Sequence, residues 1–83
     1  MRLDELPLDQ TAVITGIDWA SLGDGPSRRL RALGFEVGVV VEALHKGIFW
    51  SRDPIAIRVG RMTIALRKIQ AARISVSQSV ARA

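Results

Sequence analysis

The sequence predicts a small, mainly β domain that closes into a barrel of about five strands. Short β-branched segments recur along the 83 residues and are separated by turns rich in glycine and proline. Apolar residues make up 48% of the chain, which is enough for one efficient core in so small a domain. An open sheet of such strands would leave free edges, and closing it into a barrel removes them. We also expect a short helix between the first two strands and one helical turn before the last.

The first strand is expected over residues 11–18, after one turn of helix that Pro7 ends. The stretch TAVITGID is β-branched and almost wholly apolar, and Gly16 indicates a bend. Residues 19–27 contain two glycines, an aspartate, a proline and a serine. That composition is typical of a turn, so we expect no regular structure there.

A short helix is expected to begin at Ser27, whose side chain would cap the first amides of RRLRAL. Leu30 and Leu33 are three residues apart, so they share the face that packs on the barrel. Gly34 follows the last of them, where a left-handed cap favours glycine, and Gly38 turns the chain into the next strand. The exposed remainder of this helix is basic and consists of Arg28, Arg29 and Arg31.

The second half of the chain predicts the other strands, which are expected over residues 39–47, 55–60, 61–68 and 73–77. Gly60 is expected at a tight hairpin, and residues 68–72 are expected to make one helical turn. Apolar residues alternate with polar or small ones along three of these strands, which indicates one buried face. The side chains expected to point inward are Ile55, Ile57, Val59, Met62, Ile64, Leu66, Ile74 and Val76.

We expect a single domain over residues 1–76 and a frayed tail over residues 77–83. The absence of cysteine excludes disulfides, thiolate metal sites and cysteine nucleophiles. Without an apolar run of membrane-spanning length or a leader, the chain is expected to be soluble and cytoplasmic. Residues 1–53 carry a net charge of −2 and residues 54–83 one of +6. The basic half could face an acidic protein, nucleic acid or anionic lipid, or it could simply be a solvated face.

The inventory of reactive side chains predicts no enzyme. His45 is the only histidine, and no glycine-rich loop is followed by Lys-Ser or Lys-Thr to hold a phosphate. A firm transition-metal site needs at least two ligands at fixed geometry, and the sequence offers only His45 and Asp53 as weak candidates. A solvent-exposed histidine at the end of a strand is the alternative.

Apolar side chains in loops are the better sign of function. Ile48, Phe49 and Trp50 lie between two expected strands, where they would either cover the open end of the barrel or contact a partner beside Arg52. Trp19 in the other long loop carries the same two interpretations. The chain has four aromatic residues and none on an expected outer strand face, so it lacks a stacking platform for bases. We therefore expect no nucleic-acid partner.

The order of motifs resembles the FeoA family, the small cytoplasmic component of bacterial ferrous iron transport. The resemblance rests on LRALGFEVGVVVEALHKG and DPIAIRVGRMTIALRKIQAARISV and extends from about Leu6 to Val76. It implies an SH3-like β-barrel, no enzymatic activity, and association with the membrane transporter FeoB. The same module is similar to the C-terminal domain of iron-dependent metalloregulators.

The resulting prediction is an accessory protein that docks on the cytoplasmic face of a FeoB-type transporter and modulates Fe(II) uptake by protein–protein contact. The expected contact residues are Trp19, Arg28, Arg29, Arg31, Ile48, Phe49, Trp50 and Arg52. Gly34, Gly38 and Gly60 are expected to be structural turns. No cofactor is firmly predicted, and weak binding of a transition metal such as Fe(II) stays open, as does the oligomeric state. The alternative is a free-standing metalloregulator-type barrel that binds peptide segments or a transcriptional regulator.

Overall fold

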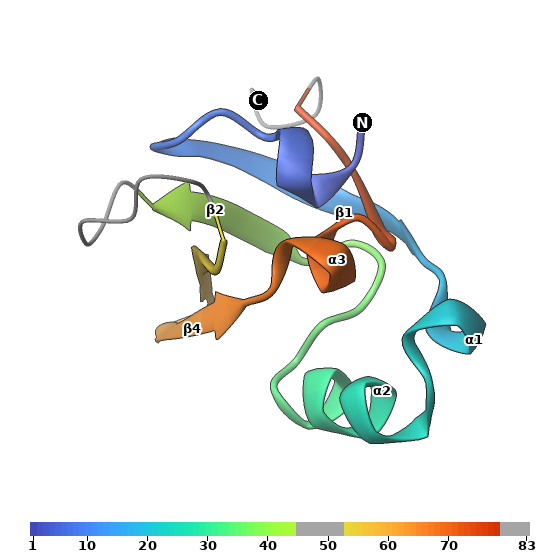
Figure 1. Cartoon of the computed structure of the whole chain (residues 1–83). Helices are drawn as coiled ribbons and strands as arrows, with labels where there is room; N and C mark the ends of the chain where they lie inside the picture. The colour runs from blue at the N-terminus through green and yellow to red at the C-terminus, as the bar shows by residue number, and fades with distance from the viewer. Residues whose placement is uncertain (45–52, 79–83) are drawn as a thin grey trace.

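A computed structural model of the protein describes residues 1–44 and 53–78. Its strands form one antiparallel sheet in the order β4-β3-β2-β1-β5 (Figure 1). The strands are β1 (Gln10–Ile17), β2 (Val40–Leu44), β3 (Ile55–Val59), β4 (Met62–Leu66) and β5 (Ile74–Ser77). The predicted mainly β class with five strands is thus confirmed. None of the helices among these residues is long and apolar enough to cross a membrane.

One face of the sheet is buried and the other is exposed, as the alternation of apolar residues predicted. The core contains residues from every strand together with Leu3, Leu6, Leu30 and Phe35. The prediction is wrong for Met62, which is 42% exposed, and Ile64 is only half-buried. Both lie on β4, which pairs only with β3 among the described strands. The other edge strand, β5, contacts η1 and keeps Ile74 and Val76 buried, so the exposure is particular to β4.

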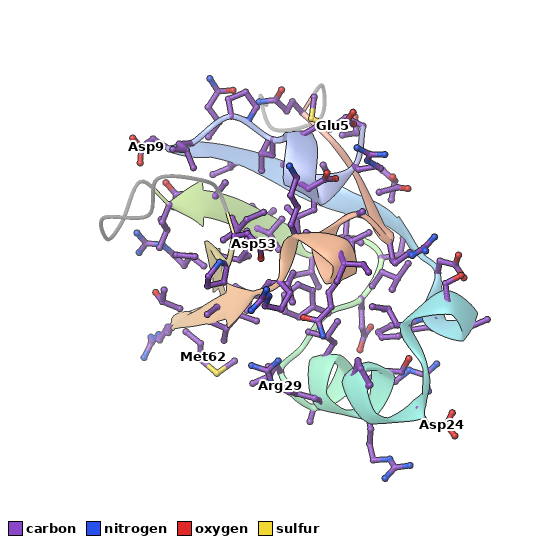
Figure 2. All side chains as sticks on the ribbon, in the orientation of Figure 1. Glu5, Asp9, Asp24, Arg29, Asp53 and Met62 are labelled. Atoms are coloured by element: carbon purple, nitrogen blue, oxygen red, sulfur yellow. The ribbon has the colours of Figure 1, made fainter. Side chains whose placement is uncertain are left out.

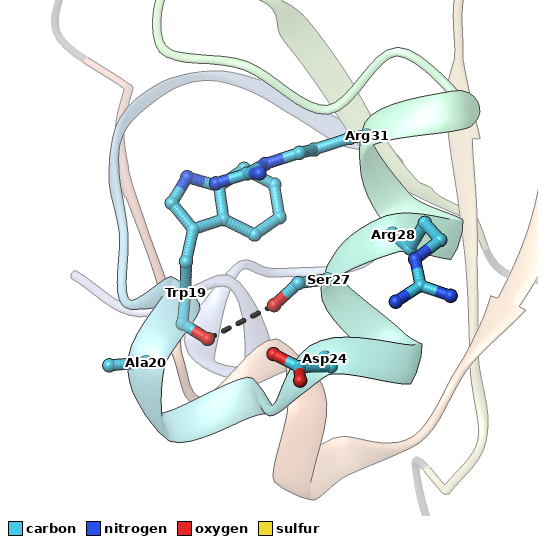
Figure 3. A pocket seen from close by; sticks show the side chains of 6 residues that line it. All are labelled: Trp19, Ala20, Asp24, Ser27, Arg28 and Arg31. Carbon is cyan, nitrogen blue, oxygen red and sulfur yellow. Dashed lines mark hydrogen bonds between the residues drawn. The ribbon is translucent and has the colours of Figure 1, made fainter.

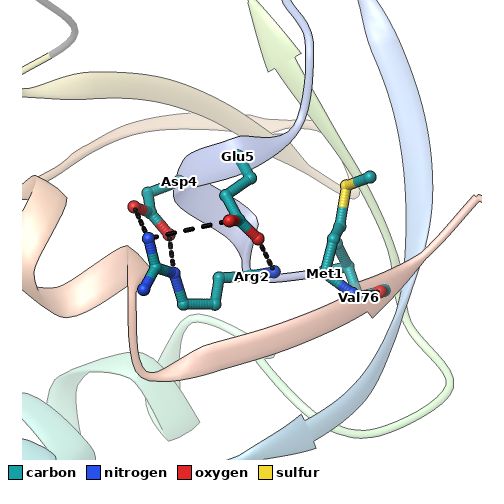
Figure 4. A network of polar contacts seen from close by, with 5 residues as sticks. All are labelled: Met1, Arg2, Asp4, Glu5 and Val76. Carbon is teal, nitrogen blue, oxygen red and sulfur yellow. Dashed lines mark hydrogen bonds and ion pairs between the residues drawn. The ribbon is translucent and has the colours of Figure 1, made fainter.

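The N-terminal residues tie the start of the chain to β5. The 3₁₀ helix η1 (Leu3–Glu5) contacts both β5 and α3 (Lys68–Ala71), the expected helical turn. The backbone carbonyl of Met1 accepts a hydrogen bond from the Val76 amide at 2.7 Å. Arg2 makes two hydrogen bonds to the buried Asp4 carboxylate, at 3.0 and 3.1 Å, and its amide donates to Glu5 at 2.8 Å (Figure 4). We call this group (Met1, Arg2, Asp4 and Glu5) the N-terminal clamp.

The connection between β1 and β2 contains two helices, α1 (Trp19–Leu22) and α2 (Asp24–Ala32), which project from the side of the sheet (Figure 1). The expectation of a turn over residues 19–27 is therefore wrong. The Asp18 carboxylate accepts from the Ser21 amide and hydroxyl, at 3.2 and 2.7 Å, and this cap allows a single turn of helix. Gly23, with a φ of 88°, separates the two helices.

The start of the second helix also differs from the prediction. Because α2 begins at Asp24, Ser27 lies inside it and does not cap its first amides. Leu30 is buried and Leu33 packs against the core, so the face predicted for this helix is the one it buries. Gly34, Gly38 and Gly60 have φ values of 98°, 96° and 61°. The chain turns at these positions into Phe35, β2 and β4 respectively.

Candidate functional site

A pocket of about 360 Å³ lies between the two projecting helices (Figure 3). Trp19 and Ala20 of α1 form one side, and α2 provides the other. The residues of α2 that line the pocket are Asp24, Ser27, Arg28 and Arg31.

Local hydrogen bonds fix the floor of this pocket. The Ser27 hydroxyl donates to the Trp19 carbonyl at 3.0 Å, and the Gly23 amide donates to the same carbonyl at 3.2 Å. The Ser27 amide in turn bonds to the Gly23 carbonyl at 3.0 Å. The buried Ser27 hydroxyl therefore gives the Trp19 carbonyl, in the first residue of α1, a second donor that comes from α2. The two short helices therefore hold each other in place.

The guanidinium of Arg31 lies over the indole of Trp19 at one wall of the pocket. The central guanidinium carbon lies 4.4 Å from the centre of the indole ring, within the range of a cation–π contact (Figure 3). A cation–π contact does not use up the N–H groups of the guanidinium, which stay able to donate hydrogen bonds. Within residues 1–44 and 53–78, no carboxylate forms an ion pair with any of the three arginines of α2.

The Asp18 cap supports this arrangement electrostatically. Hydrogen bonds from the Ser21 hydroxyl and then the Ser21 amide lower the pKa of Asp18 below 3.8, its ordinary value. The ionised carboxylate therefore persists to lower pH than in an unfolded chain, and it holds the first turn of α1 that positions Trp19.

A second pocket, of about 210 Å³, lies on the other side of α1. It is formed by Ser21 and Leu22 of α1 together with Ile69, Gln70 and Arg73. Ile69 is 72% exposed, which is unusual for a large apolar side chain. The first two residues of α1 thus line the first pocket, and its last two residues line the second. We call the surface around it the α1 face, defined by Trp19, Leu22, Arg28, Arg31, Ile69 and Arg73.

The structure brings some of the predicted contact residues together. Trp19, Arg28 and Arg31 line the same pocket, whereas Arg29 is exposed on α2 and does not line it (Figure 2). The other predicted contacts and the candidate ligand His45 lie outside the described residues; the contacts concerned are Ile48, Phe49, Trp50 and Arg52.

The sequence reasoning missed the apolar half of the α1 face, which contains Leu22 and Ile69. Ile69 and Ala71 are two residues apart in the one-turn helix α3, so the helix points them in different directions, and Ala71 is the one that is buried. The spacing alone does not decide which of the two faces the core, so the sequence carried no signal that Ile69 is exposed.

Asp53 takes part in structural contacts at the start of α3. Its carboxylate lies 3.2 Å from the Arg67 guanidinium and accepts a hydrogen bond from the Lys68 amide at 3.0 Å. Among residues 1–44 and 53–78, no group of three histidine, aspartate or glutamate side chains could hold a metal ion. The described contacts of Asp53 are those of a helix cap.

The chain is similar to proteins of ferrous iron transport. The model of the FeoA domain family matches residues 1–78. The FeoA of Stenotrophomonas maltophilia, solved with zinc and described as a prokaryotic SH3 domain protein, is 37% identical over 95% of this chain and 92% of its own, with a TM-score of 0.79. The iron(II) transport protein A of Clostridium thermocellum is 27% identical over 94% of this chain and 45% of its own, also with a TM-score of 0.79.

The IdeR of T. acidophilum shares the fold alone, at 22% identity over 94% of this chain and 33% of its own, with a TM-score of 0.76. No curated protein matches the chain significantly. The likeness to S. maltophilia FeoA confirms the SH3-like fold that the sequence predicted.

Proposed function

The chain belongs to the FeoA family, whose model matches residues 1–78, and on this premise we propose that it docks on the cytoplasmic face of a FeoB-type membrane transporter. In this role it modulates Fe(II) uptake by protein–protein contact, with iron as the cargo of the transporter. The proposal places the protein in the cytoplasm, recruited to the inner face of the membrane, and includes no catalytic step.

The α1 face is the observation that supports this proposal. It combines a half-buried Trp19 and an exposed Ile69 with arginines that have no carboxylate partner among the described residues. Tryptophan and arginine are enriched among the residues that dominate binding energy at protein interfaces. Apolar side chains surrounded by arginines suit a partner surface that has an apolar centre and acidic residues around it.

The docking is tested by calorimetric titration with the purified cytoplasmic domain of the FeoB-type transporter of the same organism, with and without guanine nucleotide. We expect Ile69→Asp to weaken binding at least about tenfold, because it places a charge at the apolar part of the α1 face. Met62→Asp is the matched control, since Met62 is an exposed apolar residue that lines neither pocket of the α1 face (Figure 2). Equal binding by both variants would contradict the proposed surface.

The loop residues predicted from the sequence form a second arm of the same experiment. We propose that Phe49 and Trp50 add apolar contacts, so the double alanine variant is expected to lose about 2 kcal/mol or more of binding free energy. A circular-dichroism spectrum checks that the barrel is intact. If binding and the spectrum both stay unchanged, Phe49 and Trp50 are not part of the interface. The Ile69→Asp variant then remains the test of the α1 face.

A further inference from the structure

We propose that the pocket between α1 and α2 is a carboxylate-binding subsite that receives an aspartate or glutamate side chain of an acidic partner segment. The proposal deepens the proposed function, on which it rests for the identity of the partner. The pocket itself is defined by Trp19 of α1 and by Asp24, Arg28 and Arg31 of α2 (Figure 3).

The donors of this pocket are held in position before any ligand arrives. The guanidinium carbon of Arg31 lies 4.4 Å from the centre of the Trp19 ring, and this cation–π contact keeps the group at the pocket wall. A guanidinium can donate two parallel N–H groups to the two oxygens of a carboxylate. The ring itself is fixed at its backbone, because the buried Ser27 hydroxyl holds the Trp19 carbonyl at 3.0 Å.

The charge of the pocket favours an anion with a single negative charge. Two guanidinium groups and one carboxylate line it, so its formal charge is +1. A bound carboxylate makes the pocket neutral, whereas a phosphate dianion would leave it negative next to Asp24. Asp24 also belongs to the first turn of α2, where a negative charge stabilises the helix. It therefore serves the fold and at the same time disfavours highly charged ligands.

The size and position of the pocket fit a protein segment. A volume of about 360 Å³ is at the lower end of the range for small-ligand sites and accommodates an acidic side chain with part of its backbone. The second pocket, on the other side of α1, offers Leu22 and Ile69 to an apolar residue of the same segment. An acidic, amphipathic peptide matches both hollows, and nucleic acid or lipid headgroups match only the arginines.

The test is an NMR titration of the full chain with the capped peptide acetyl-Gly-Glu-Glu-Gly-amide. The readouts are the indole N–H signal of Trp19, assigned with Trp19→Phe, and the Nε–H signal of Arg31. We expect both to shift and saturate with this peptide and to stay in place with its glutamine counterpart. Inorganic phosphate and anionic phosphatidylglycerol vesicles form parallel arms. Saturation at lower concentration by either of these would overturn the carboxylate assignment.

The matched variants are Arg31→Gln and Arg29→Gln, which remove the same charge from the same helix. We expect Arg31→Gln to weaken peptide binding at least about tenfold and Arg29→Gln to change it less than twofold, since Arg31 lines the pocket and Arg29 does not. Unchanged dispersion of the remaining amide signals confirms that each variant is folded. Equal loss in both would show a diffuse charge effect and overturn the proposal.

The same variants separate this proposal from the docking proposal. One outcome is that the transporter domain binds Arg31→Gln with the same affinity as the unmodified chain, while Ile69→Asp weakens binding. That result would support the docking proposal and contradict the carboxylate subsite. If the acidic peptide saturates the pocket but the transporter domain does not bind, the subsite stands and the partner is a different acidic protein.

Discussion

The arginines of the barrel and those of the α1–α2 projection (residues 19–32) differ in their partners. Arg2, Arg58 and Arg67 each lie within about 3.2 Å of a carboxylate, on Asp4, Glu42 and Asp53 respectively. Arg28, Arg29 and Arg31 have no such partner among the described residues, and only Arg31 makes an aromatic contact. Three arginines of the barrel are therefore paired within the chain, whereas none of the three in the projection forms an ion pair with a described carboxylate. The same residue type thus stabilises the fold at these three barrel positions, and in the projection its charge stays available for the binding that we propose.

The two regions also differ in how they hold their apolar side chains. In the barrel they point into one core, but the projection reaches that core through few residues, chiefly Leu30 and the following Phe35. The rest of its apolar surface, with Trp19 and Leu22, is only half-buried. The projection is therefore expected to be easier to perturb without unfolding the barrel, except at its anchors.

The largest effect is expected at the anchor itself. Phe35→Ala removes a fully buried ring at the junction between the projection and β2, and we expect the free energy of unfolding to fall by about 3–5 kcal/mol. That loss is a large fraction of the stability of a typical small domain. Urea denaturation followed by circular dichroism measures it. Val37→Ala, at a position that is 64% exposed, is the control and should change stability by less than about 0.5 kcal/mol.

If Phe35→Ala proves as mild as its control, the projection does not depend on the core for its attachment. The contrast between the two regions would then have to be explained by the hydrogen bonds of α1 and α2 alone.

A smaller effect is expected at the left-handed turn that ends the projection. Gly34 has a φ of 98°, so Gly34→Val is expected to lower the free energy of unfolding by about 1–3 kcal/mol. An added Cβ would meet no atom within 4 Å, so the cost comes from the backbone conformation and not from crowding. Gly25→Ala in α2 is the control, because it has equal space and no positive φ. Its stability should stay unchanged or rise by up to about 1 kcal/mol. Normal stability of the valine variant would disprove the turn.

The contrast between paired and unpaired arginines is tested by one substitution in each region. Asp4→Asn removes the charge that faces Arg2 in the N-terminal clamp, where the Asp4 side chain is only 4% exposed. We expect a loss of about 1–2 kcal/mol in the free energy of unfolding. Arg29→Glu, on the exposed side of α2, should change it by less than about 0.5 kcal/mol. Chemical denaturation of both proteins in the same buffer decides the comparison, and equal destabilisation would show that the α2 arginines have a structural role.

Sequence reasoning predicted the barrel more completely than the projection, for a physical reason. Strands with one buried face impose a period of two, so the inward positions Ile55, Ile57 and Val59 could be read directly, and only the edge strand β4 departed from the pattern. The helix α1 has four residues and one capping aspartate, too short a signal to separate from a turn.

The pocket was beyond sequence reasoning for a similar reason. Trp19 and Arg31 were each expected to contact a partner, but their cation–π contact with each other depends on how α1 and α2 are joined, and the Ser27 hydrogen bond is part of that junction. That bond links residues eight positions apart across a glycine turn. Composition alone favoured a loop there, and in a loop the two side chains need not meet.

The smallest effect is expected from acid, through Asp18 in the projection. Hydrogen bonds from Ser21 lower the pKa of this carboxyl below 3.8 in the folded chain. A carboxyl whose pKa is lower in the folded than in the unfolded state stabilises the fold above the unfolded pKa, and that contribution disappears as the pH falls through the folded pKa. The free energy of unfolding should therefore exceed that of Asp18→Asn at pH 7, and the difference should shrink below about pH 3.8. Asparagine keeps the capping geometry, so the comparison isolates the charge.

Glu5 in the N-terminal clamp is the matched group of the barrel. The hydrogen bond from the Arg2 amide lowers its pKa below 4.5, so its contribution has the same sign and is lost from a slightly higher pH. NMR titration separates the two regions, because the Ser21 amide and the Trp19 indole follow Asp18 while the Arg2 amide follows Glu5. A midpoint at or above 3.8 for the Ser21 amide would mean that the cap does not hold α1. The Trp19–Arg31 wall of the pocket would then lack the support on which carboxylate recognition depends.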